Sequence, residues 1–195
     1  MITFQDYERH GSHWWGIYSR EFSWDGPKGN QDIRIRDDSR RHEQYVSTAL
    51  NSQGYSAFIF HDHAYTGYRI QFRAPQGTLF GDRYLTHSAY AGSDIALTED
   101  GKIIAVYSTT NDTHDSDGYA IVAQLFDVVS GEATSEPFLV NQTTSGDQRY
   151  PSVATYPDGQ FIVTWEGNGS GDGDGIYARR YHADGSPQTS EFRVN

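Results

Sequence analysis

Cysteine is absent from this chain of 195 residues, and methionine occurs only once. Without cysteine the protein has no disulfide bond, no thiolate zinc site and no thiol nucleophile. No segment keeps a helical periodicity over ten residues, which argues against a helix bundle. No apolar run approaches membrane-spanning length, and the N-terminus lacks a basic and then apolar signal peptide. These absences favour a strand-based fold without a transmembrane helix.

Basic residues are also few, because 15 lysines and arginines stand against 26 aspartates and glutamates. The net charge of −11 argues against nucleic-acid binding, which needs a basic face to neutralise phosphates. Glycine and aromatic residues are plentiful instead, with 20 Gly, 14 Tyr, 10 Phe and 4 Trp. This composition is typical of short strands separated by turns around an aromatic-rich core.

A sequence unit expected to form four strands is repeated about three and a half times along the chain. When the copies are aligned on a turn glycine, an aromatic residue follows that glycine by six positions in each copy. The glycines are Gly54, Gly101 and Gly159, and the aromatic residues are Phe60, Tyr107 and Trp165. The end of the third strand is expected at Phe22, Phe72, Phe126 and Tyr181. A period of about fifty residues with four strands each indicates a β-propeller or a similar radial array.

We therefore expect an all-β fold, a β-propeller-like array of four-stranded antiparallel blades in one domain over 1–195. The expected blades span 2–37, 45–87, 93–141 and 150–195. In the last blade, strands are expected at 152–155, 161–165, 176–181 and 191–194. The first unit lacks an inner strand, and such an open edge favours association. A compact ring with one deficient blade, a larger ring made by a homodimer, and a piece of a longer propeller are the alternatives.

The segment 138–195 resembles a known bacterial repeat. It reads FLVNQTTSGDQRYPSVATYPDGQFIVTWEGNGSGDGDGIYARRYHADGSPQTSEFRVN. The pattern VN…GDQ…PSVA…DG.FVVTW…GIYA.RF is that of repeats in large RTX-like or haemolysin-type calcium-binding surface and secreted proteins. The similarity is specific over 138–195, moderate over 93–137 and weak before that. The resemblance implies a propeller-like scaffold outside the cell or on its surface, often with calcium, as in adhesins. It implies no reaction.

Chain order assigns each loop to one end of the blades. The tight glycine turns fall at one end, and the longer loops, within and between units, fall at the other. Seven of the eight histidines lie in the longer loops, and only His182 does not. They are His10, His13, His42, His61, His63, His87 and His114. We interpret this end as a binding surface, although long loops also accumulate polar residues without a function.

Two acidic loops are candidate calcium ligands. Asp115 and Asp117 in one unit and Asp172 and Asp174 in the next occupy equivalent loops, each pair spaced as Asp-x-Asp-Gly. Closely spaced carboxylates on a glycine-containing turn suit Ca²⁺, but the pattern is shorter than an EF-hand loop. A solvated acidic loop is the alternative interpretation.

Histidines supply candidate catalytic or zinc-binding residues. His61 and His63 would point the same way if the strand continues through them, as two transition-metal ligands would. His10 and His13, from the equivalent loop of the preceding unit, could complete such a site with Zn²⁺ or another transition metal. No HExxH, GxSxG or phosphate-binding loop is present, and solvated histidines are the alternative.

Aromatic and polar residues on the same loops are candidates for ligand binding, since ring faces stack on sugars while polar groups hold hydroxyls. They are Trp14, Trp15, Tyr65, Tyr90, Tyr119, Arg149 and Tyr150. The leading hypothesis is an extracellular, calcium-associated, lectin-like module that binds a glycan, a small molecule or a surface partner. One alternative is an enzyme that uses the histidine-rich loops on a small molecule or saccharide, with or without a metal. A second is a structural spacer of a large adhesin.

Overall fold

A computed structural model describes the protein over most of its length. The described residues are 2–7, 15–20, 22–23, 26–27, 33–35, 43–63, 66–87, 90–110, 115, 117–169 and 171–195. All regular structure in these residues is β-strand. The strands are β1 (Ile2–Tyr7), β2 (Trp15–Arg20), β3 (Phe22–Ser23), β4 (Gly26–Pro27), β5 (Ile33–Arg34), β6 (Glu43–Leu50), β7 (Ser56–Asp62), β8 (Gly67–Arg73), β9 (Leu79–His87), β10 (Ser93–Leu97), β11 (Lys102–Thr109), β12 (Ala120–Asp127), β13 (Phe138–Leu139), β14 (Gln148–Thr155), β15 (Phe161–Gly169), β16 (Asp172–Tyr181) and β17 (Phe192–Arg193).

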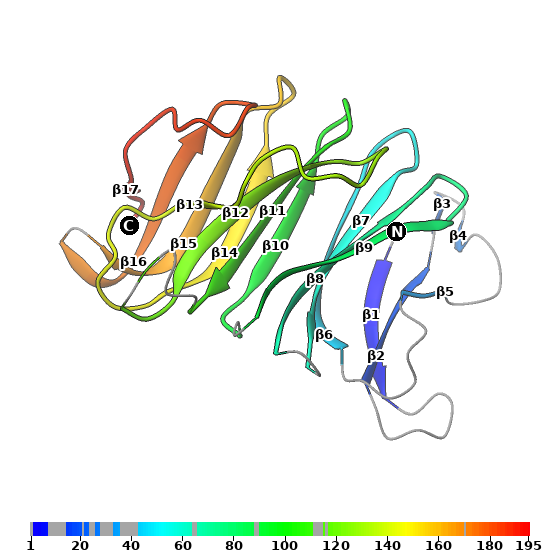
Figure 1. Ribbon diagram of the computed structural model, residues 1–195, viewed down its shortest axis with the longest axis horizontal. Helices are drawn as coiled ribbons and strands as arrows, with labels where there is room; N and C mark the ends of the chain where they lie inside the picture. Colours follow the sequence, from blue (N-terminus) through cyan, green and yellow to red (C-terminus); the bar gives the residue numbers. More distant parts are fainter. Residues whose placement is uncertain are drawn as a thin grey trace.

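Three antiparallel sheets have four strands each, in chain order: β6 to β9, β10 to β13, and β14 to β17. A three-stranded sheet of β1, β2 and β5 precedes them, with a separate β3–β4 pair. The sheets follow one another across Figure 1 from β1 and β2 to β16 and β17, and they do not close on themselves. The prediction of an all-β chain with antiparallel four-stranded sheets is confirmed.

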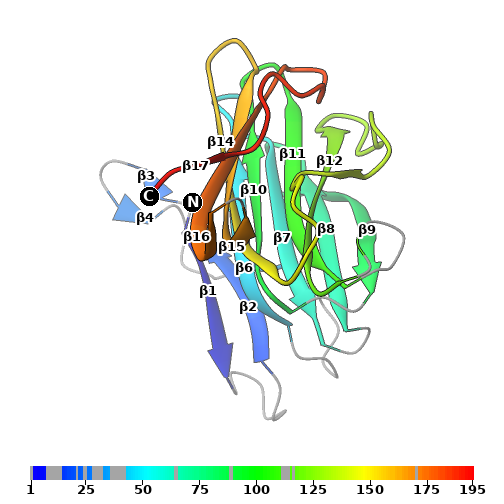
Figure 2. The same ribbon diagram turned by 90° about the vertical axis from the view of Figure 1, so that its left-hand side faces the viewer.

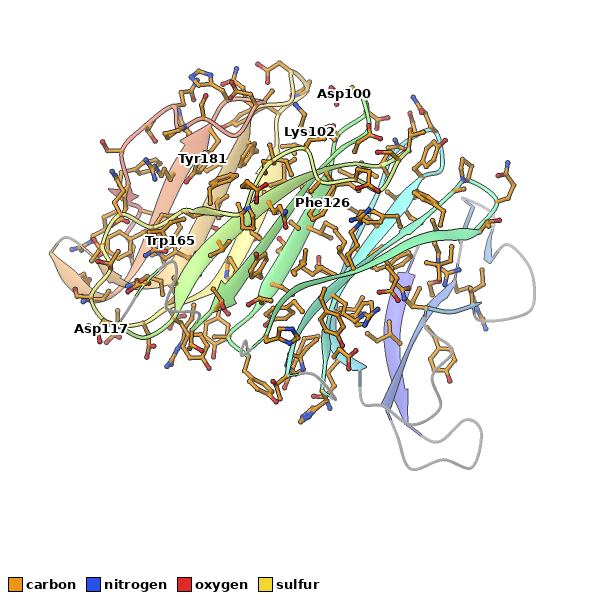
Figure 3. The ribbon with its side chains drawn as sticks, viewed as in Figure 1. Asp100, Lys102, Asp117, Phe126, Trp165 and Tyr181 are labelled. Carbon is orange, nitrogen blue, oxygen red and sulfur yellow. The ribbon has the colours of Figure 1, made fainter. Side chains whose placement is uncertain are left out.

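Side chains alternate between the two faces of a strand, and β7 and β11, the second strands of the first two four-stranded sheets, bury both faces. In β11, Ile103 and Tyr107 pack toward the β6–β9 sheet, while Ile104 and Val106 pack toward the β14–β17 sheet. The aromatic residues six positions after the turn glycines all face the preceding sheet and are buried: Phe60, Tyr107 and Trp165. Figure 3 shows Trp165 and Tyr181 on neighbouring strands in the core between the last two sheets.

One part of the predicted register is wrong. Phe126 and Tyr181 each pair with the residue two positions after their turn glycine, but Phe72 pairs with Ala57, three positions after Gly54. A register shift between β8 and β9 at Phe72 accompanies this offset, and a one-residue offset moves a side chain to the opposite face of a sheet. Phe72 therefore faces the following sheet, where its ring lies 5.7 Å from that of Phe126. The prediction for Phe22 is also wrong. This residue lies in the short strand β3, and not at the end of the third strand of a repeat unit.

The β14–β17 sheet has one face that no described residue covers. Ile162 and Thr164 of β15 lie on this face, three and five residues after the turn glycine Gly159, and both are half-buried. The equivalent residues of β11, Ile104 and Val106, are fully buried against the next sheet. The last sheet thus leaves open the face that the two preceding sheets use for packing, and the exposed Arg180 lies on it opposite Ile162.

A single carboxylate connects the inner strands of three sheets. Asp94 in β10 accepts hydrogen bonds from the hydroxyls of Ser47 in β6 (2.5 Å) and Ser152 in β14 (2.9 Å). The amide of Val153 donates to the same carboxylate at 3.0 Å. Ser47, Asp94 and Ser152 all lie seven residues before their turn glycines, so the connection follows the repeat.

We expect Asp94→Ala to lower the free energy of unfolding by about 2–4 kcal/mol, because hydrogen bonds to a charged group are lost and a backbone donor is left without an acceptor. Glu132→Ala is the matched control, since it removes an exposed ion pair with Arg83 that also joins two sheets. That control should change the unfolding free energy by less than about 0.5 kcal/mol. Urea unfolding followed by tryptophan fluorescence measures both, and equal effects would contradict the role given to Asp94.

Candidate functional site

The strand pairing places the longer loops together at one end of the sheets, called the loop end below. Glu43 pairs with Asp62, and Gly67 pairs with His87, so the loop within a unit and the loop between units lie side by side. In Figure 3, Asp117 lies at this end, and Asp100 and Lys102 lie at the opposite, turn end. Figure 2 views the row of sheets from the β14–β17 side.

A cavity of about 430 Å³ opens at the loop end of the last sheet. One wall is the segment that enters β14, and the other is formed by the end of β15 and the start of β16. The lining residues are Gly146, Asp147, Arg149, Glu166, Gly167, Asn168, Gly173 and Asp174. Arg149 and Asp174 were predicted as functional residues, whereas Asp147, Glu166 and Asn168 were missed.

The first wall is held by the preceding sheet. The amide of Tyr119 donates to Asp147 at 3.0 Å, and the amide of Gly146 donates to Asp117 at 3.0 Å. Gly118 lies between these contacts with a φ of +96°, and a Cβ there would lie 2.7 Å from the Asp147 carboxylate. Glycine is therefore required at 118 both by conformation and by space.

Arg149 is oriented by two contacts. Its guanidinium forms an ion pair with Asp147 and lies 5.1 Å from the centroid of the Tyr119 ring. Its Nε is buried and has no hydrogen-bond partner among the described residues. The structure thus brings together Tyr119 and Arg149, two of the predicted ligand-binding residues, and the exposed Tyr150 follows directly in the chain.

The second wall supplies an amide and two carboxylates. Asn168 donates through its side-chain nitrogen to the carbonyl of Ser145 at 2.8 Å, which ties this wall to the first. Glu166 and Asp174 are exposed. With Asp147 and Arg149, the cavity offers three carboxylates, one guanidinium and one amide to a polar ligand.

The predicted calcium ligands form two separate pairs. Asp115 is 6% exposed and accepts the amide of Asp117 at 2.9 Å, while its Oδ2 is buried without a hydrogen-bond partner in the described part of the chain. Asp172 accepts the amide of Asp174 at 3.2 Å and lies 3.7 Å from Arg193. Among the described residues, no three or more His, Asp and Glu side chains are grouped as a metal site.

The two predicted histidines of β7 lie close together but in different environments. The strand ends at Asp62, so His61 is fully buried and His63 is exposed, with their ring centroids 5.5 Å apart. The His61 ring also lies 4.3 Å from that of Tyr90 and 5.6 Å from that of Tyr68. Burial raises the pKa of Tyr68 to about 12, so its hydroxyl stays protonated at neutral pH while it accepts the amide of Gly92 at 2.8 Å.

Several predicted site residues cannot be placed. His10, His13, Trp14 and Tyr65 lie outside the described residues, and only the backbone of Trp15, at the start of β2, is described.

Sequence reasoning also missed a polar cluster across β7, β8 and β9. Asp62 is fully buried, accepts the hydroxyl of Tyr84 at 2.8 Å and lies 3.8 Å from Arg69. Arg69 also pairs with Asp82 and lies 4.2 Å from the centroid of the Tyr84 ring. No local motif marks this cluster, because its members meet only through strand pairing.

No family model matches the chain, and no curated protein matches it. Solved structures do. A protein of unknown function from Dyadobacter fermentans has a TM-score of 0.61 at 12% identity, covering 91% of this chain and 49% of that one. The β-propeller domain of the Trilobed protease from Pyrococcus furiosus, described as having an open velcro topology, has a TM-score of 0.57 at 10% identity, with 99% and 52% covered.

An α-L-arabinofuranosidase from Fusarium graminearum, solved with an iminosugar inhibitor, has a TM-score of 0.55 at 15% identity, with 98% of this chain and 62% of that one covered. The chain thus spans about half to three-fifths of the length of these structures. At identities of 10–15% the likeness concerns the fold, and the fold of this chain is similar to that of β-propellers.

Proposed function

We propose that this protein is a binding module for saccharides, with the cavity at the loop end of the last sheet as the binding site. The observation that supports this most is the lining of that cavity, which presents charged and amide side chains from two walls. A volume of about 430 Å³ lies within the range of small-molecule sites. It suits one or two sugar rings.

The donors and acceptors match the chemistry of adjacent hydroxyl groups, each of which both donates and accepts a hydrogen bond. Asp147, Glu166 and Asp174 supply acceptors, while Arg149 and Asn168 supply donors. Because Arg149 is already held by Asp147 and Tyr119, little side-chain entropy is lost when it binds a ligand.

An extracellular or cell-surface location belongs to the same proposal and is supported by the resemblance of 138–195 to repeats of secreted proteins. The described residues contain no helix that is long and apolar enough to cross a membrane.

We expect Arg149→Ala to weaken saccharide binding at least about tenfold, since charge-assisted hydrogen bonds are the strongest polar contacts available. A glycan array identifies the retained sugars, and isothermal titration calorimetry with one of them measures the affinity. Arg83→Ala, in β9 of another sheet, is the matched control and should bind as the unmodified protein does. Equal affinities for both variants would contradict the proposed site, and a chain that retains no sugar would favour the spacer alternative.

An enzyme is the second candidate, favoured by the three carboxylates that line one cavity. Hydrolysis of a glycosidic bond needs one carboxylic acid and one carboxylate on either side of it. Release of reducing sugar from a retained oligosaccharide would identify the protein as a hydrolase. In that case Glu166→Gln or Asp174→Asn should abolish turnover while binding persists.

Calcium in the loop at 115–118 is a further proposal, supported by the buried Oδ2 of Asp115, which lacks a hydrogen-bond partner in the described part of the chain. Asp115 would hold the cation, whose positive charge would offset the cost of burying the carboxylate. Binding of a transition metal by His61 and His63 remains a prediction. Titration with Zn²⁺ in the melting experiment described next tests it.

After treatment with a chelator, millimolar Ca²⁺ should raise the melting temperature by several degrees, because a ligand that binds only the folded state stabilises it. Asp115→Asn should abolish this shift. Asp184→Asn, in an exposed turn at the opposite end, should keep it. A shift that survives in Asp115→Asn would place the cation elsewhere, and no shift in the unmodified protein would refute calcium binding.

We also propose that two copies of the chain join into one larger ring. The uncovered face of the last sheet supports this, because the corresponding faces of the two preceding sheets pack against the next sheet in the row. The chain also spans about half the length of the similar β-propeller domain, which is consistent with two copies.

Light scattering should give a mass near twice 22.0 kDa. Ile162→Lys should halve that mass, because the lysine would bury a charge in the new interface. Val129→Lys, at an exposed turn of the neighbouring sheet, should leave the mass unchanged. A single-chain mass for the unmodified protein at high concentration would refute the proposal.

A further inference from the structure

A strained backbone conformation recurs at one register of the repeat. The residue nine positions before each turn glycine has a positive φ: 56° at Tyr45, 97° at Gly92 and 52° at Tyr150. Glycine adopts this conformation without cost, whereas a tyrosine crowds its Cβ against the backbone. Two of three sheets therefore keep a tyrosine where glycine would be less strained.

Packing does not explain these tyrosines. Both lie at a register shift at the start of an inner strand, between residues 44 and 47 in β6 and between residues 149 and 152 in β14. Each tyrosine is 60% exposed, so burial of its ring contributes too little to offset the backbone strain. Backbone strain that is not offset by packing of the same side chain is a marker of functional positions.

Tyr45 and Tyr150 lie near the start of β6 and β14, the two inner strands that are linked to β10, and Gly92 directly precedes β10. Two residues further along, the bridge from Ser47 through Asp94 to Ser152 holds the three inner strands together. The amide of Tyr150 donates to Ala91 at 2.7 Å. A Cβ at Gly92 would lie 2.9 Å from the Cα of Tyr150 and 3.4 Å from its ring, so the glycine leaves the space that Tyr150 needs.

A third exposed ring lies in the same row. Tyr90 precedes Gly92 by two residues, is 45% exposed, and lies 5.8 Å from the exposed His63 ring and 4.3 Å from the buried His61 ring. At the other end of the row, Tyr150 directly follows Arg149, which lines the cavity. Each of three neighbouring sheets thus carries an exposed tyrosine at or just before the loop-end start of its inner strand, and Tyr150 is next in sequence to a residue of the cavity.

We propose that Tyr45, Tyr90 and Tyr150 form a stacking track for a saccharide chain that extends from the cavity across the sheets. This inference rests on the proposed saccharide site and names its ligand class: an oligosaccharide of several rings. Stacking on a tyrosine ring tolerates different sugars and adds affinity with each tyrosine that is engaged. The affinity should therefore rise with the length of the saccharide until all three tyrosines are occupied.

The test compares mono- and hexasaccharides of glucose, xylose and galactose by calorimetry. The unmodified protein should bind a hexasaccharide at least about tenfold more tightly than the matching monosaccharide. Tyr150→Gly and Tyr45→Gly should each remove at least about fivefold of the hexasaccharide affinity, while the monosaccharide affinity changes less than twofold. Tyr150→Phe should restore hexasaccharide binding, because the ring face is kept. Tyr156→Gly, an exposed tyrosine beyond the other end of β14, is the control and should have no effect.

Thermal unfolding separates a stacking role from a structural one. Both glycine variants should melt at or above the temperature of the unmodified protein, because positive φ suits glycine. A marked loss of stability would show that the tyrosines hold the fold and would overturn the inference. Equal affinities for mono- and hexasaccharides would overturn the track but leave the cavity as a binding site. Failure of every saccharide to bind would refute both proposals.

Discussion

Burial of both faces of each inner sheet is the constraint on which the rest of this structure depends. Residues of β11 pack alternately against the preceding and the following sheet, so neither face tolerates a polar stripe. Burial of apolar surface stabilises the fold by about 25 cal/mol per Å², and a shift of one residue in β11 would exchange its two apolar sets between the two interfaces and so misfit both. The turn glycines matter because they set the register from which this alternation starts.

Polar contacts determine how closely the inner strands approach one another. Asp94 gathers hydrogen bonds from two neighbouring sheets, and the close approach it maintains makes a side chain at 92 too large beside Tyr150. The positive φ near the start of each inner strand belongs to this packing, whereas packing does not explain why two of these positions carry tyrosine.

The cavity depends on the same association of sheets. Its first wall is held by Asp117 and Tyr119 from the preceding unit, so the site exists only when two sheets pack together. Loops of this kind can change their chemistry while the buried strands stay the same, as is common in folds that carry many functions. The position of Arg149 therefore depends on the packing of neighbouring sheets.

The sequence by itself determined the period, the strands, the turn glycines and the buried aromatic six residues after each, because turns and strand alternation are local properties. It also placed Arg149 and Asp174 at the end where the cavity lies. Only the tertiary structure decided that Phe72 faces the following sheet, since a register shift between β8 and β9 accompanies its offset. It alone brought Asp147, Glu166 and Asn168 around one cavity and buried Asp62 beneath Tyr84. Contacts between sheets depend on bulges and strand pairing across distant segments, which no local pattern records.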